Sequence, residues 1–204
     1  PTDAQNSNYN LFPHLNLPYD DNFQYDLSNE INFSLFPKRF TYDIDQKSKI
    51  AVFQPISLKN KPIELKKDFI ATWDKSVSSL LEKKYKIYVV GSSEDLDLVH
   101  EIYGHKSFLY LDNVINLMGC LDIFESIELV MKKADFVLSC DSWAGWYGIA
   151  SRKKTAYAAG PLIENGTDSH YLNCIKNKDV FFMDYSSKKE ETDKNMAKWI
   201  QNNA

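Results

Sequence analysis

From Lys49 onward the chain alternates short apolar runs with longer stretches of helical period, and this alternation limits the possible folds more than any other feature. Short apolar runs bounded by polar residues, glycine or proline predict buried strands. Five runs are predicted strands: residues 50–53, 86–90, 136–138, 155–158 and 180–182. Residues 108–111 are a weaker predicted strand. The stretches between them predict helices, and this order is typical of an α/β, Rossmann-like parallel sheet with helices on both faces.

Three of the predicted helices carry one apolar face each. Apolar side chains recur at helical spacing over residues 65–81, 94–103 and 123–131, and residues 188–202 form a predicted closing helix. In the second of these helices the spacing places His100 on the apolar face together with Val99, so we expect His100 to be a core residue.

The first 47 residues have a different composition. They are rich in asparagine, aspartate and aromatic residues without a lasting period, and Pro13, Pro18 and Pro37 interrupt any long element. We therefore expect an irregular aromatic arm, or the remnant of an upstream domain, at residues 1–47. It would pack on the main domain or on a second domain or chain, and residues 48–204 would form the Rossmann-like domain.

Composition excludes several classes of function. The net charge is −4 and arginine occurs only at Arg39 and Arg152, so no basic stripe for nucleic acid is expected. No apolar run is long enough to span a membrane, and no leader is visible, which favours a cytoplasmic protein. The three cysteines are far apart and the histidines lack suitable neighbours, so neither a disulfide framework nor a metal site is expected.

Ligands of open parallel sheets bind at the carboxyl ends of the strands, which makes the loops at residues 55–62, 91–95 and 141–145 the candidate site. In the last loop Asp141 and Ser142 are good helix caps, and the backbone amides after them suit a phosphate. The alternative is that Asp141 only caps its helix.

The two earlier loops leave similar alternatives open. Glu94 suits a ribose diol, or it complements the helix dipole while Ser93 caps the helix. Ser57 and Lys61 suit a diphosphate, or Lys61 is simply solvated. The glycine-rich motifs of dehydrogenases and of P-loop ATPases do not occur.

Two motifs resemble the core of glycosyltransferase family nine, the heptosyltransferase family. Residues 116–119 read Asn-Leu-Met-Gly, and residues 134–142 read Ala-Asp-Phe-Val-Leu-Ser-Cys-Asp-Ser. A later Gly160-Pro161 pair is also similar to that family, and the resemblance extends over about residues 49–165.

The resemblance implies the carboxyl-terminal, donor-binding half of a GT-B glycosyltransferase. Such an enzyme needs no cofactor and no metal, and it uses a nucleotide-diphosphate sugar as its donor. The residues that would bind this donor are Ser57, Lys61, Glu94, Asp141, Ser142, Trp143, Ala144 and Gly145. Of these, Ser57 and Lys61 would meet the diphosphate, Glu94 the ribose and the amides after Ser142 a phosphate, while Asp141 would cap its loop or bind the donor sugar.

The chain departs from the family at two tryptophans. The family usually has glycine at the position of Trp143 and histidine at that of Trp146. These indoles either stack on a base or a sugar, or they pack into the core.

The main functional hypothesis is a glycosyltransferase, or its donor-binding part, acting on a glycan or lipid acceptor. The family's acceptor-binding domain does not fit into residues 1–47, so a longer chain or a partner chain would have to supply it. The second hypothesis is a non-catalytic glycosyltransferase-like binding or assembly module, and a weaker third is a nucleotide-sugar epimerase, which shares the fold. The residues do not identify the catalytic base, the sugar, the acceptor or the oligomeric state.

Overall fold

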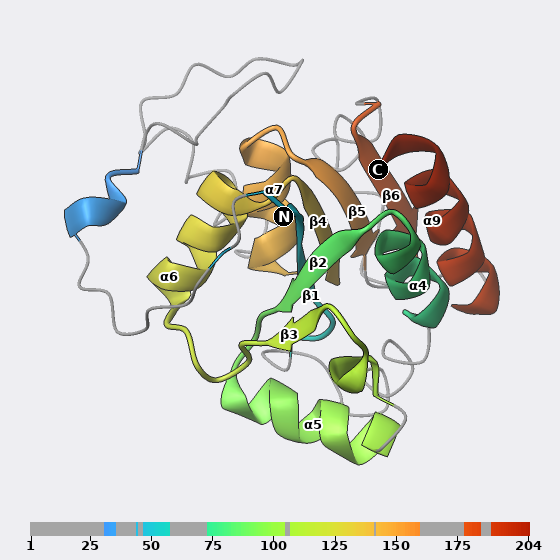
Figure 1. Cartoon of the computed structure of the whole chain (residues 1–204), viewed down its shortest axis with the longest axis horizontal. Coiled ribbons are helices and arrows are strands. Elements are labelled where there is room, and N and C mark those ends of the chain that lie inside the picture. Colours follow the sequence, from blue (N-terminus) through green and yellow to red (C-terminus); the bar gives the residue numbers. More distant parts are fainter. Residues whose placement is uncertain are drawn as a thin grey trace, which may run out of the picture.

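A computed structural model describes residues 31–35, 44, 47–57, 73–104, 107–140, 142–159, 178–184 and 189–204. Its centre is a six-stranded, all-parallel sheet of order β3-β2-β1-β4-β5-β6 (Figure 1). The strands are β1 (Lys49–Gln54), β2 (Tyr85–Val89), β3 (Val114–Asn116), β4 (Phe136–Cys140), β5 (Lys154–Ala159) and β6 (Val180–Asp184). The predicted α/β, Rossmann-like class is confirmed, and five of the six strands lie where the apolar runs predicted them.

Helices cover both faces of this sheet. They are α4 (Asp74–Glu82), α5 (Ser93–Tyr103), α6 (Ile123–Glu128), α7 (Trp143–Ala150) and α9 (Lys189–Asn203), with a π-helical turn, η5 (Leu129–Lys133), directly after α6. One core cluster joins the sheet to α4, α5 and α9, and a second joins its other face to η5 and α7. In Figure 1, α6 lies beside α7 and α4 lies beside α9.

The predicted strand at residues 108–111 is wrong. Phe108–Tyr110 form a 3-10 helix, η4, and the third strand, β3, begins at Val114. The Ser107 hydroxyl accepts a hydrogen bond from the Leu109 amide (3.2 Å) and so starts the 3-10 turn. Phe108 packs its ring 5.0 Å from that of Phe53, so the apolar run covers the sheet instead of extending it.

The placement of His100 in the core is also wrong. Leu98 and Val99 are the buried residues of α5, while His100 is exposed. The stripe that faces the sheet runs through Asp95, Leu98, Val99 and the half-buried Ile102, and His100 lies outside it. Its Nδ1 lies 3.4 Å from the hydroxyl of the exposed Tyr110.

Part of the predicted arm is described, in a 3-10 turn, η2 (Phe33–Leu35). Phe33 is buried against Ile127 and Met131, so this turn packs on the α6–η5 segment. Most of residues 1–47 lie outside the described residues, and the boundary between arm and domain stays a prediction. No helix in the described ranges is long and apolar enough to cross a membrane.

A carboxylate from α9 caps the amino end of α4. Asp193 is buried and accepts hydrogen bonds from the Lys75 amide (2.9 Å), the Ser76 amide (3.0 Å) and the Ser76 hydroxyl (2.6 Å). Burial raises the pKa of Asp193, and the hydrogen bonds from Ser76 and Lys75 oppose that shift. The two helices, which are far apart in the sequence, are joined at this point.

We expect Asp193→Ala to lower the free energy of unfolding by about 2–4 kcal/mol, because two amides and a hydroxyl lose their acceptor. Chemical denaturation monitored by circular dichroism measures this loss. Glu191→Ala, at an exposed position of the same helix, is the control and should change stability by less than about 0.5 kcal/mol. Equal stability of the two variants would contradict the capping role.

Candidate functional site

The strand order reverses between β1 and β4, and this is where open parallel sheets bind ligands. The chain moves outward from β1 through β2 to β3, then returns to place β4 on the other side of β1. Ser57 follows β1, Glu94 follows β2 and Ser142 follows β4, so the topology brings all three to the same edge. Lys61 and Asp141, the other two charged site residues from the sequence, lie outside the described residues.

A buried glutamine bridges β1 and α7 at the place where the strand order reverses. Gln54 ends β1 with 2% of its surface exposed, and its Oε1 accepts a hydrogen bond from the Ala144 amide in the first turn of α7 (3.2 Å). The next amide, of Gly145, donates to the Ser139 hydroxyl (3.1 Å), which itself donates to the Cys140 carbonyl (2.7 Å). A phosphate on these two amides would therefore have to displace Gln54 and Ser139.

Gly145 is required by packing on β5. A Cβ atom there would lie 2.1 Å from Cδ2 of Tyr157, a fully buried residue. The adjacent Ala144 is fully buried as well. The small residues at the start of α7 thus let this helix lie directly on the sheet, and this packing accounts for them without a ligand.

The two tryptophans of α7 are half-buried and contact different parts of the domain. Trp143 packs with Ile127 and Met131 on the α6–η5 side. Trp146 packs with Ile149 and Val180, and its ring centroid lies 5.6 Å from that of Tyr157. Both indoles therefore contribute to core packing, as one of the two sequence alternatives expected.

The loop after β2 begins α5 with a capping box. Ser92, one residue before the predicted Ser93, is the cap: its hydroxyl accepts from the Asp95 amide (3.1 Å), and Asp95 accepts from the Ser92 amide (3.0 Å). Glu94 takes no part in this box and is exposed in the first turn of α5. Its carboxylate complements the helix dipole and remains accessible from solvent.

The Asn-Leu-Met-Gly turn holds this loop in place. Asn116 accepts a hydrogen bond from the Met118 amide (3.0 Å), and the Gly119 amide donates to the Gly91 carbonyl (2.9 Å). Gly119 has a φ of 73°, and a Cβ there would lie 3.2 Å from Cα of Ser93. The turn thus positions the start of α5, and with it Glu94.

The described residues contain no group of three or more histidine, cysteine or acidic side chains that could hold a metal ion. Cys140 is buried at the end of β4, and Cys120 is exposed. Neither belongs to a cluster of that kind.

No family model and no curated protein matches the chain. Among solved structures, it is similar to the E. coli ADP-heptose LPS heptosyltransferase II, with a TM-score of 0.52 and 11% identity over 76% of this chain and 47% of that one. A glycosyltransferase of family 9 from Veillonella parvula gives a TM-score of 0.47 at 14% identity, over 70% and 37% of the respective chains. The chain thus spans about half the length of the heptosyltransferase and has a heptosyltransferase-like, Rossmann-type fold.

Removing the Gln54 acceptor should destabilise the domain. We expect Gln54→Met to cost about 1–3 kcal/mol of unfolding free energy, because the buried Ala144 amide would be left without a partner. Gln201→Met is the matched control, since Gln201 makes only an exposed hydrogen bond to Glu82, and it should cost less than about 0.5 kcal/mol. If Gln54→Met is as stable as this control, the bridge contributes nothing to the fold.

Gly145→Ala should cost about 1–3 kcal/mol by overpacking against Tyr157. A double-mutant cycle with Tyr157→Leu, followed by urea denaturation, tests the contact. The combined loss should be smaller than the sum of the single losses, because the leucine gives the new methyl group room. Strict additivity would mean that the two residues do not meet.

Proposed function

We propose that this chain is the donor-binding part of a glycosyltransferase that uses a nucleotide-diphosphate sugar. The observation that carries this proposal is the heptosyltransferase-like fold with Ser57, Glu94 and Ser142 at the carboxyl edge of β1, β2 and β4. Transfer to a glycan or lipid acceptor would need a second domain or chain, because the chain spans about half the length of the heptosyltransferase.

The proposed roles follow from the position of each group. The exposed carboxylate of Glu94 would accept two hydrogen bonds from the ribose hydroxyls. Ser57, Lys61 and the Ser142 hydroxyl, which makes no capping bond to α7, would face the diphosphate. Asp141 would cap its loop or meet the sugar.

The α7 helix would act on the diphosphate mainly through its dipole. The amides of Ala144 and Gly145 are bonded to Gln54 and Ser139, but the positive end of the helix still points to this edge. Charge that develops on the departing diphosphate would be stabilised by this field together with Lys61.

A non-catalytic binding module is the second candidate. It is favoured by the same two internal hydrogen bonds to Gln54 and Ser139 and by the packing of Trp143 and Trp146 onto the domain. Such a module would keep the fold and bind no nucleotide diphosphate.

Thermal unfolding in the presence of nucleotide diphosphates and their sugars separates the two candidates. A donor site should raise the melting temperature selectively for one base, because a ligand that binds only the folded state stabilises it by mass action. The absence of any shift across the panel would favour the non-catalytic module.

Glu94→Ala and Lys61→Ala should each weaken binding of the selected nucleotide diphosphate about tenfold while the unliganded melting temperature stays unchanged. Titration calorimetry measures the affinity. Asp97→Ala and Lys133→Ala remove the same charges from exposed positions on α5 and η5, and they should bind like wild type. Unchanged affinity in both site variants would remove these residues from the site.

A further inference from the structure

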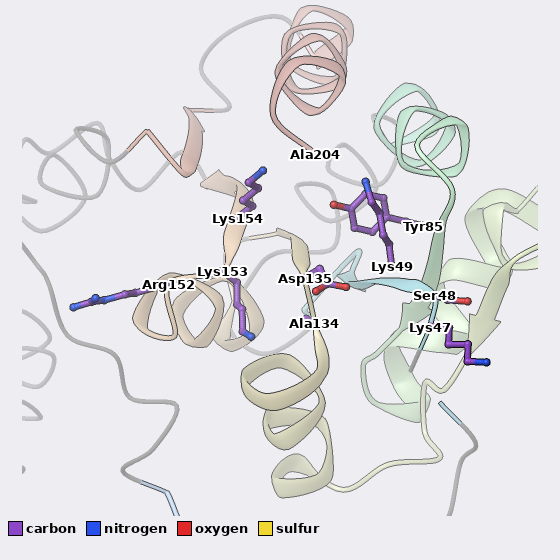
Figure 2. A pocket seen from close by; sticks show the side chains of 10 residues that line it. All are labelled: Lys47, Ser48, Lys49, Tyr85, Ala134, Asp135, Arg152, Lys153, Lys154 and Ala204. Carbon is purple, nitrogen blue, oxygen red and sulfur yellow. The ribbon is translucent and has the colours of Figure 1, made fainter. Parts of the chain in front are cut away.

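A concave site lies at the amino-terminal edge of the sheet, opposite the candidate donor site (Figure 2). It is a cavity of about 660 Å³, formed where β1, β2, β4 and β5 begin. Because the candidate donor site lies at the carboxyl ends of these strands, the two sites are on opposite edges and share no residue.

The cavity is strongly basic although the whole chain has a net charge of −4. Five cationic side chains line it: Lys47, Lys49, Arg152, Lys153 and Lys154. Among the described residues that line the cavity, Asp135 is the single acidic one, and its Oδ2 already accepts a hydrogen bond from the Ile50 amide (2.8 Å). The three lysines Lys49, Lys153 and Lys154 alone outnumber this carboxylate.

Nearby helix ends do not balance this charge either. Lys154 donates a hydrogen bond to the Asn203 carbonyl at the end of α9, and Arg152 and Lys153 follow the end of α7. A helix carboxyl end carries a negative charge of roughly half a unit, so two such ends offset about one positive charge. Lys49, Lys153 and Lys154 together therefore outweigh Asp135 and these two helix ends.

Two lysines stand on opposite walls. Figure 2 shows Lys49 and Tyr85 on one side and Lys154 on the other, with Asp135 between them, while Lys47 and Arg152 extend outward. The Lys49 ammonium lies 5.2 Å from the Tyr85 ring centroid, and this cation–π contact stabilises its position over the ring. Burial and the charge of Asp135 raise the pKa of Tyr85, so its phenol stays protonated and its hydroxyl can donate a hydrogen bond.

We propose that this cavity binds a compact, soluble anion with two phosphate groups, of the diphosphate class. Lysine ammonium groups bind phosphate as point charges, and walls on opposite sides suit a ligand with charge at both ends. The cavity is concave and has Lys49 and Lys154 on opposite walls, which favours a small ligand. A membrane surface would instead require cations that project together from one face.

The test is titration calorimetry of the full chain with inorganic diphosphate at low salt. Wild type should bind, and Lys49→Gln/Lys154→Gln should bind at least about tenfold more weakly. Lys75→Gln/Lys194→Gln removes two charges from exposed positions on α4 and α9 outside the cavity and should bind like wild type. Lys49→Arg, which keeps the charge, should also bind, and circular dichroism checks that every variant folds.

Three outcomes would overturn the proposal. Wild type fails to bind diphosphate, the two double variants lose affinity equally, or the chain binds vesicles of anionic lipid but not soluble diphosphate. Lys61→Ala, which removes the lysine proposed to meet the donor diphosphate, separates the two sites: loss of inorganic diphosphate binding in Lys49→Gln/Lys154→Gln but not in Lys61→Ala assigns the anion to the cavity. The amino-edge site can therefore hold or fail independently of the proposed transferase function.

Discussion

The parallel pairing of β1 with both β2 and β4 is the interaction on which the rest of the structure depends. Ile50 and Val52 enter one core cluster and Ala51 and Phe53 enter the other, so this strand joins both helical layers. A strand buried on both faces has to be almost wholly apolar. Gln54 ends it as a buried polar residue, and the strand order reverses at this strand.

The elements with the longest apolar runs could be predicted from the sequence. Interior parallel strands such as β1, β2 and β4 read as unbroken apolar runs, and their order with helices indicates the sheet. The run at residues 108–111 has the same appearance and is a 3-10 turn, because a short apolar run does not distinguish a strand from a buried turn. The prediction that His100 lies in the core was wrong because a small error in helical phase turns a residue at the boundary of the apolar face outward.

The site could be predicted only at the level of loops. The position of Ser57, Glu94 and Ser142 at one edge follows from topology. The bridge from Gln54 to α7 could not be found, because its partner is 90 residues away. The one available signal was a glutamine ending an apolar run, since a buried polar group needs a partner. Lys61 and Asp141 stay predictions.

One buried tryptophan, Trp73, lies next to the carboxyl edge of the sheet, and its fluorescence reports on that edge. Trp73 is 1% exposed, and its indole Nε1 donates a hydrogen bond to the Pro55 carbonyl (3.1 Å), two residues before Ser57. The other tryptophans, Trp143, Trp146 and Trp199, are half-buried. The fluorescence of Trp73 should therefore be blue-shifted relative to theirs, and it gives the protein an intrinsic optical probe of the backbone just after β1.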